Sequence, residues 1–227
     1  MKEFLINLVK LLLSIIIVLF TQEYFFKILG LVGIELSNSP VVKLIIYILE
    51  FIAIYIIYKA EITSAFSKYQ NKLGSNLLYT IISYIVVFIT MMITNYLVKL
   101  VANNLDIIYT EPNFINIFNE PFDLNLIITF IVDLIIIPFV KVSIFVLGIN
   151  SLINGKAGSI ICGLSYALYE GFMMGGNFGA VFIDCIDELV LFILLSYLYK
   201  KNGNIVYSVL TLIFYELFSG LIITKLL

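Results

Sequence analysis

Long apolar runs separated by short polar stretches dominate the chain. A membrane-spanning helix needs about 20 apolar residues, and about seven runs approach that length: Phe4–Phe20, Val41–Tyr58, Leu77–Leu100, Leu126–Ile149, Gly158–Met174, Gly179–Tyr199 and Ile205–Ile223. The segment Tyr24–Glu35 is a candidate for an eighth, interfacial or half-crossing helix. The pattern therefore predicts an all-α fold, a polytopic transmembrane helix bundle that forms a single integral membrane domain over residues 1–227.

The polar stretches between the runs are too short to hold a soluble domain. The longest are Lys59–Asn76 and Val101–Asn125. We interpret Lys59–Asn76 either as a solvated connector or as a short amphipathic helix lying on the membrane.

The lysines predict an orientation in the membrane. Cytoplasmic loops carry an excess of basic residues, and lysines gather at alternate loops: Lys2, Lys10, Lys59, Lys68, Lys72, Lys156, Lys200 and Lys201. The loop Val101–Asn125 holds acidic residues and no lysine, as expected outside. We therefore predict a cytoplasmic N-terminus and an external C-terminus.

Composition agrees with a membrane protein and excludes some functions. The hydrophobic fraction is 62% and the mean hydropathy is +1.12, outside the range of soluble domains. A net charge of −2 leaves no basic patch to neutralise phosphates, which argues against nucleic acid as a partner. Lysine without arginine, with abundant Ile, Asn and Tyr, is typical of an AT-rich bacterial genome and so favours a bacterial plasma membrane. Cys162 and Cys185 are isolated in apolar runs, as expected of small buried residues.

Ionisable residues inside the apolar runs are the candidates for a functional site. A charge near the bilayer centre costs about 3 kcal/mol on insertion scales, so it normally faces a partner or a wet cavity. The predicted intramembrane polar cluster comprises Asp133, Lys141, Tyr166, Glu170, Asp184, Asp187, Glu188 and Glu216. Lys141 lies about 12 Å deeper than Asp133 at 1.5 Å per residue. We expect one carboxylate to neutralise it and the others to be protonated or hydrated.

Three interpretations of this cluster stay open. It is a structural ion-pair core, a proton or cation site, or the remnant of a catalytic site. Glu50, alone in the second run, is a candidate member. Pro138 removes a backbone hydrogen bond to Leu134 and predicts a kink just before Lys141.

A stripe of small residues marks the fifth run as a helix-packing surface. It recurs every fourth position at Ser159, Gly163, Ala167, Gly171 and Gly175, a spacing that lets another helix approach closely. Tyr166 and Glu170 are also four residues apart, so they share a neighbouring face of the same helix.

Segments of the C-terminal half resemble motifs of the intramembrane metal-dependent proteases. This superfamily includes the type II CAAX prenyl endopeptidases, the bacterial Abi or bacteriocin-immunity proteins and PrsW. Pro138–Val142 (PFVKV) is similar to a Pro-Phe-x-Glu-Glu motif, Gly163–Glu170 (GLSYALYE) looks like a helix with a Phe-x-x-x-Glu ending, and Leu195–Gly203 (LSYLYKKNG) resembles a helix tail with its turn. The resemblance implies a protease-like helical core over residues 126–227, preceded by N-terminal spans in residues 1–100.

The chain departs from this family at the catalytic positions. Lys141 and Val142 replace the two glutamates, and Tyr215 and Ser219 stand where the family has His-x-x-x-Asn. Such enzymes use Glu and His to bind a metal or activate water. The resemblance therefore implies a core with no metal, no cofactor and no complete active site, in which Glu170 is the one residual catalytic candidate.

Three functions follow from these observations, in order of preference. The first is a non-catalytic relative that binds a membrane protein or a peptide, as in immunity or sensor regulation. The second is a membrane subunit of a small-molecule or ion transporter that uses the acidic cluster. The third is an unconventional intramembrane protease around Glu170 and Asp184. The lipid bilayer is the surrounding partner in all three.

Overall fold

The computed structural model describes residues 2–21, 40–104, 124–174 and 178–226, without the side chains of residues 40, 174, 178–184 and 219–226. Every element in these ranges is a helix, which confirms the predicted all-α class for the described part of the chain. The candidate helix Tyr24–Glu35 and most of the loop Val101–Asn125 lie outside the described residues.

Helices occupy each apolar run from which a span was predicted. Continuous helices are α1 (Lys2–Leu19), α3 (Pro40–Ile57), α5 (Leu73–Asn104), α9 (Gly155–Met174), α10 (Phe178–Asn202) and α11 (Ile205–Leu226). The fourth run forms one broken helix made of α6 (Leu124–Ile131), η3 (Val132–Ile136), α7 (Ile137–Lys141), η4 (Val142–Gly148) and α8 (Ile149–Leu152). A further helix, α4 (Lys59–Gln70), covers a polar stretch.

Fewer helices than predicted meet the requirements of a membrane span. By length and composition, α5 and the broken helix Leu124–Leu152 are long and apolar enough to cross a bilayer. Residues 41–57 of α3 and the helix α4 are bent against each other. They make a third candidate span if the two together form one span. The described part of the chain thus indicates a membrane-associated protein with two or three candidate spans, and neither the count of seven nor the predicted orientation is confirmed.

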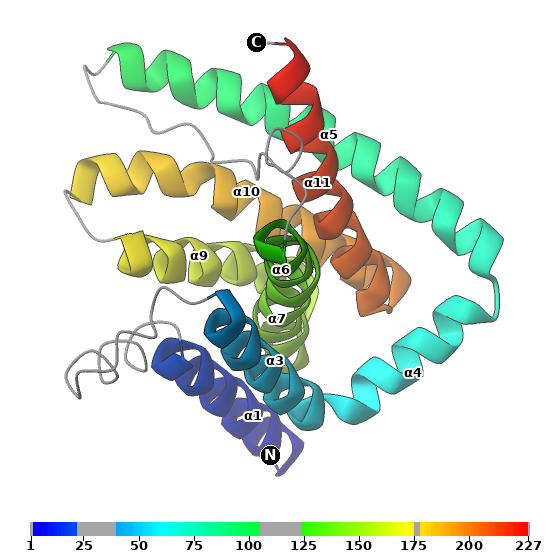
Figure 1. Ribbon diagram of the computed structural model, residues 1–227. Coiled ribbons are helices and arrows are strands. Elements are labelled where there is room, and N and C mark those ends of the chain that lie inside the picture. Colours follow the sequence, from blue (N-terminus) through cyan, green and yellow to red (C-terminus); the bar gives the residue numbers. More distant parts are fainter. Residues whose placement is uncertain (1, 22–39, 105–123, 175–177, 227) are drawn as a thin grey trace.

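The broken helix forms the axis of the molecule. It runs through the centre of Figure 1, and it contacts α1, α3, α9, α10 and α11. Its second half is the best-protected part of the chain, because every residue from Val142 to Asn150 is buried. A helix that is apolar on all sides is stable only when neighbours surround it, and this position satisfies that condition.

Two π-helical segments, η3 and η4, flank Pro138 on the broken helix. In the first, the Ile137 N–H donates to the Val132 carbonyl, five residues back. Proline has no N–H and its ring displaces the preceding turn, and wider turns of this kind absorb such a break. The predicted irregularity is therefore present, and Lys141 lies where α7 passes into η4.

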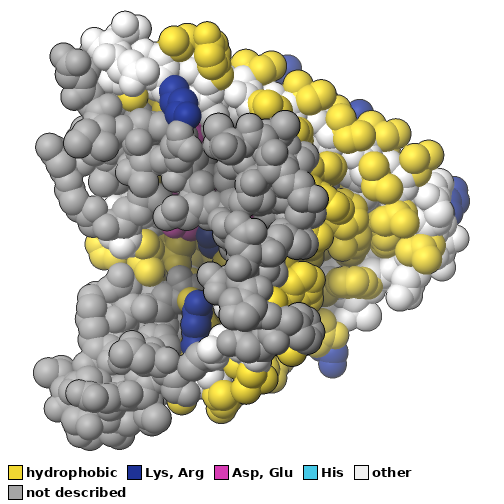
Figure 2. All heavy atoms as spheres, turned by 45° about the horizontal axis from the view of Figure 1, so that its top comes forward, with side chains coloured by type: hydrophobic (Ala, Val, Ile, Leu, Met, Phe, Trp, Pro, Cys, Tyr) yellow, Lys and Arg dark blue, Asp and Glu magenta, His cyan; other side chains and the backbone are white. Residues whose placement is uncertain are grey.

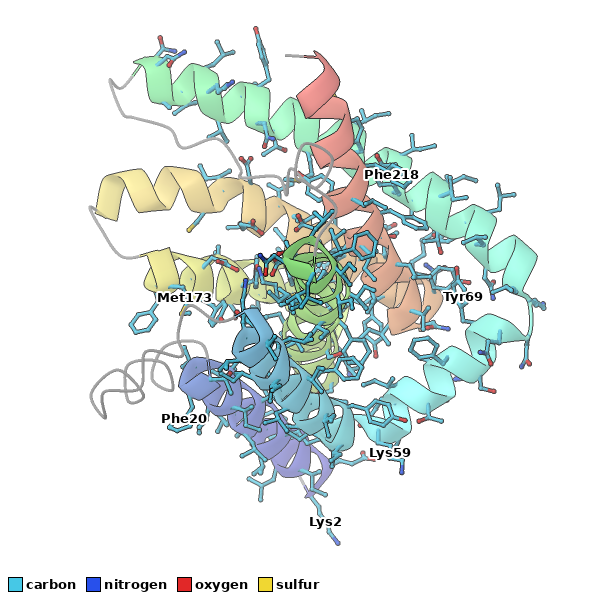
Figure 3. The ribbon with its side chains drawn as sticks, viewed as in Figure 1. Lys2, Phe20, Lys59, Tyr69, Met173 and Phe218 are labelled. Atoms are coloured by element: carbon cyan, nitrogen blue, oxygen red, sulfur yellow. The ribbon has the colours of Figure 1, made fainter. Side chains whose placement is uncertain are left out.

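The stretch Lys59–Asn76 begins as a helix rather than as an irregular connector. Its helix α4 turns 88° away from α3, and Ile62, Ala65 and Tyr69 are buried on one face. Figure 3 shows the two ends of this helix, with Lys59 at the bend and Tyr69 near α11. The Tyr69 ring packs edge-on against Tyr207 of α11, with ring centroids 5.2 Å apart.

The outer face of α5 is apolar and exposed. Its large exposed side chains include Leu77, Leu78, Ile81, Ile82, Ile85, Val86, Ile89 and Ile93. Hydrophobic side chains gather along this side of the molecule in Figure 2. An apolar surface of this extent on a helix of spanning length is what contact with lipid requires.

Candidate functional site

Lys141 and Glu170 form an ion pair between the broken helix and α9. The Lys141 Nζ lies 2.8 Å from the Glu170 Oε1, and the two side chains are 28% and 18% exposed. Lys141 ends α7, and Glu170 lies in the C-terminal part of α9. The half-buried lysine thus has a specific partner, and that partner comes from α9, the helix with the small-residue stripe.

Tyr166 completes this pair from one turn earlier on α9. Its hydroxyl donates a hydrogen bond to the Glu170 Oε1, and the Lys141 ammonium lies 5.1 Å from the centroid of its ring. The ring is stacked on Phe192 of α10, with an interplanar angle of 19°, and meets Phe145 edge-on. The tyrosine is 1% exposed, so aromatic packing holds its hydroxyl toward the carboxylate.

We expect Tyr166→Phe to lower the free energy of unfolding in detergent by about 2 kcal/mol, because hydrogen bonds to charged groups contribute about 1.5–3 kcal/mol. The phenylalanine keeps the stack on Phe192, so the change reports the hydroxyl. Chemical denaturation followed by circular dichroism measures it. Tyr197→Phe, at an exposed tyrosine of α10, is the control and should change stability by less than about 0.5 kcal/mol. Equal effects of the two substitutions would show that the Tyr166 hydroxyl contributes nothing specific.

Two more glutamates of the predicted cluster act on Lys141 through space. Glu188 of α10 and Glu216 of α11 both interact electrostatically with its ammonium. Glu188 also interacts with Glu170 and Glu216. One lysine therefore serves three carboxyl groups, which come from three different helices.

The other predicted members are divided between separate contacts. Asp133 lies 3.6 Å from the Lys43 Nζ of α3, and it is also within electrostatic range of Lys141. Asp187 is 5% exposed and turns toward α5, where the Asn95 amide nitrogen, oriented to donate, lies 2.7 Å from its carboxylate. The sequence predicted a single cluster. In the structure, three glutamates surround Lys141, while Asp133 faces Lys43 of α3 and Asp187 faces Asn95 of α5.

Part of the predicted small-residue stripe lies against α10. Ser159, Gly163 and Ala167 are buried, and Gly163 faces Leu189 and Ile193. Gly171 is half-buried. Gly175 and the side chain of Asp184 lie outside the described residues.

A buried polar network that the sequence analysis missed ties the broken helix to α9 and α10. The Asn150 Nδ2 donates to the Ser196 Oγ at 2.8 Å, and the Ser196 Oγ lies 3.1 Å from the Ser159 Oγ. Asn150 is conspicuous in the sequence as an amide at the end of an apolar run, and Ser196 lies inside another run. Both were detectable as polar residues that need partners in a membrane.

Glu50 has a local partner. It is 1% exposed, and the Thr21 hydroxyl donates to its Oε2 at 2.9 Å. It belongs to the contact between α3 and the end of α1, and it interacts electrostatically with Tyr47 beside the Lys43–Asp133 pair.

The arrangement around Lys141 is suited to charge compensation. Among the described residues, no three Asp, Glu, Cys or His side chains converge as metal ligands. The Glu170 Oε1 accepts hydrogen bonds from the Lys141 ammonium and from the Tyr166 hydroxyl. No family model, curated protein or solved structure matches the chain.

Proposed function

We propose that this chain is a multi-pass protein of a bacterial plasma membrane whose protease-like core has lost catalysis and acts as a non-catalytic binding, immunity or regulatory protein. The observation that carries the proposal is the ion pair between Lys141 and Glu170. Lys141 replaces a glutamate of the first protease-like motif, Pro138–Val142, and Glu170 is the last residue of the second, Gly163–Glu170. The ion pair joins these two positions.

The ion pair supports a loss of hydrolase chemistry. A general base must take a proton from water, and Glu170 Oε1 already accepts hydrogen bonds from Lys141 and Tyr166, which makes this oxygen a poorer proton acceptor. A lysine in place of a metal-binding or water-activating glutamate supplies a fixed positive charge instead. Glu170 is then neutralised within the core, which in our proposal keeps its shape without turning over a substrate.

The partner that we propose is a membrane protein or a hydrophobic peptide. Its contact surface is the lipid-facing side of the bundle, of which α5 exposes the broadest apolar face among the described helices. Helices associate in membranes through close packing as well as through interhelical hydrogen bonds. We propose close packing for this face, because the Thr90 and Thr94 hydroxyls of α5 donate to carbonyls of α5 itself.

The loss of catalysis is tested by a cleavage assay in proteoliposomes. We expect the wild-type protein to leave lipid-embedded peptide substrates intact, at a rate indistinguishable from that of Glu170→Gln and of empty vesicles. A PrsW-type or CAAX-type protease reconstituted in the same vesicles is the positive control. Cleavage by the wild-type protein that disappears in Glu170→Gln would contradict the proposal and favour an unconventional protease.

A membrane subunit of an ion or small-molecule transporter is the second candidate. It is favoured by the excess of carboxyl groups around Lys141, since Glu188 and Glu216 share one lysine with Glu170. Carboxyl groups inside a membrane protein commonly mark proton or cation pathways. Proton or cation flux in proteoliposomes that is abolished by Glu188→Gln would favour this function over the first.

A further inference from the structure

We propose that the bend between α3 and α4 is a binding site for one anionic phospholipid, whose phosphate sits against Lys59 and the start of α4 and whose acyl chain lies along α3. This proposal concerns a different part of the molecule from the polar core and does not depend on the function proposed for that core.

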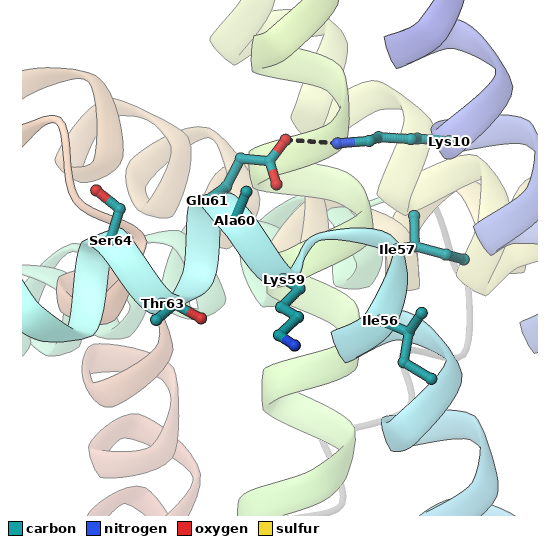
Figure 4. Close-up of a pocket in the computed structure, with 8 residues that line it drawn as sticks. All are labelled: Lys10, Ile56, Ile57, Lys59, Ala60, Glu61, Thr63 and Ser64. Carbon is teal, nitrogen blue, oxygen red and sulfur yellow. Dashed lines mark hydrogen bonds and ion pairs between the residues drawn. The ribbon is translucent and has the colours of Figure 1, made fainter.

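A pocket of about 570 Å³ opens at this bend. It is lined by Lys10 of α1, by Ile56 and Ile57 at the end of α3, and by the first turns of α4 with Lys59, Ala60, Glu61, Thr63 and Ser64. Figure 4 shows these side chains around the elbow of the chain, with Lys59 on one edge and Lys10 on the other. The pocket thus combines ammonium groups, hydroxyl groups and branched apolar side chains.

The charges at the pocket leave one lysine available for an anion. The Lys10 Nζ lies 2.6 Å from the Glu61 Oε1, so these two side chains compensate each other and fix the rim of the pocket. Lys59 is exposed and adds a further positive charge. An ammonium group has three donors, so Lys10 also keeps donors beyond its bond to Glu61.

The start of α4 adds backbone donors to the same place. The helix has 12 residues, and Tyr58 at its N-cap position makes no side-chain capping bond. The first N–H groups of a helix have no partner within the helix, and together with the helix dipole they attract an anion. The chain turns by 88° here, so α4 begins as a new helix, and its first residues line the pocket.

An apolar track leads away from the pocket along α3. Ile56, Ile52, Leu49 and Ile45 are all exposed, and their spacings of four, three and four residues place them on one face of the helix. The track is about 16 Å long at 1.5 Å per residue, which is close to half of the roughly 30 Å hydrocarbon core. A phosphate at the Ile56 end of this track and an acyl chain along the track match a phospholipid of one leaflet.

The setting of the pocket favours a lipid over a soluble phosphate. Apolar α3 ends here and polar α4 begins, which is the change expected at the boundary between hydrocarbon and water. A basic residue near this boundary attracts an anionic lipid by about 1 kcal/mol. Lys59 lines the pocket, whereas Lys68 and Lys72 lie outside it.

Native mass spectrometry of the full chain, released from a neutral detergent, tests the site with phosphatidylglycerol and phosphatidylcholine as probes. We expect one phosphatidylglycerol to be retained more tightly than phosphatidylcholine, and Lys59→Gln to weaken its binding about fivefold. The matched control is Lys68→Gln, which removes an exposed lysine of the same helix outside the pocket and should leave the affinity unchanged. Ile56→Ser interrupts the apolar track and should also weaken binding.

Three outcomes would overturn the proposal. One is equal binding of the two lipids. Another is an equal loss in Lys59→Gln and Lys68→Gln, which would indicate diffuse attraction to the basic end of α4. The last is full displacement of the lipid by millimolar glycerol 3-phosphate, which would make the pocket a site for a soluble phosphate.

Discussion

Replacing Lys141 by methionine is expected to lower the free energy of unfolding in detergent by about 3 kcal/mol. The substitution keeps an unbranched side chain one atom shorter than lysine but leaves Glu170 without its cation at 2.8 Å. Removal of one partner from a largely buried ion pair is destabilising, because the remaining charge is still mostly withdrawn from water. Glu188 and Glu216 lose the same compensating charge, which adds to the effect.

The matched control for this substitution is Lys43→Met. Lys43 lies 3.6 Å from Asp133, but its side chain is 44% exposed, and exposed pairs contribute about 0–1 kcal/mol. Chemical denaturation of both variants in one detergent gives the comparison. An unchanged stability of Lys141→Met, or a loss no larger than that of Lys43→Met, would contradict the role assigned to the Lys141–Glu170 pair.

A bulky side chain at position 163 is expected to destabilise the bundle by about 3 kcal/mol or more. A Cβ on Gly163 would lie 2.5 Å from the Leu189 carbonyl oxygen and 2.6 Å from the Ile193 Cγ1. The first of these atoms is backbone, so the contact cannot be relieved by a side-chain rotation. Gly163→Leu would therefore force α9 and α10 apart and displace Tyr166 from its stack on Phe192.

Gly74→Leu is the control for this prediction, because a Cβ at Gly74 would meet nothing within 4 Å. The yield of monodisperse protein and the unfolding midpoint measure both variants. If Gly163→Leu is as stable as Gly74→Leu, then close approach of α9 to α10 does not hold this part of the bundle together.

The positions of the helices follow from the apolar runs because a helix in a membrane depends on local composition. The runs Leu77–Leu100 and Leu126–Ile149 correspond to α5 and to the broken helix within a few residues at each end. The number of spans does not follow in the same way. By length and composition, α5 and the broken helix can cross a bilayer, whereas α3 turns 88° into α4.

The site was predictable as a set of residues but not as a set of contacts. Lys141 stands out in the sequence because it is basic in an apolar run, and Glu170 because it follows Tyr166 at helical spacing. Their pairing depends on α9 lying beside the broken helix, which is a long-range property of the fold. For the same reason, neither the contact of Asp187 with Asn95 of α5 nor that of Asp133 with Lys43 could be predicted from the sequence.

Lys141 matters both for the stability of the bundle and for the proposed function. As a structural group it neutralises Glu170 at the junction of the broken helix and α9. As a replacement in a protease-like motif it supports the proposal that the core binds rather than cleaves. A core in which Glu170 is neutralised can hold its shape, and we propose that the outer surfaces, including the pocket at the α3–α4 bend, contact lipid and partners.

The most direct test is a double-mutant cycle of Lys141→Met and Glu170→Gln, with unfolding free energies measured in one detergent. We expect the double variant to be more stable than the sum of the single losses implies, with a coupling energy of about 2 kcal/mol. Additive losses, within about 0.5 kcal/mol, would show that Lys141 and Glu170 do not act as a pair and would contradict the central claim.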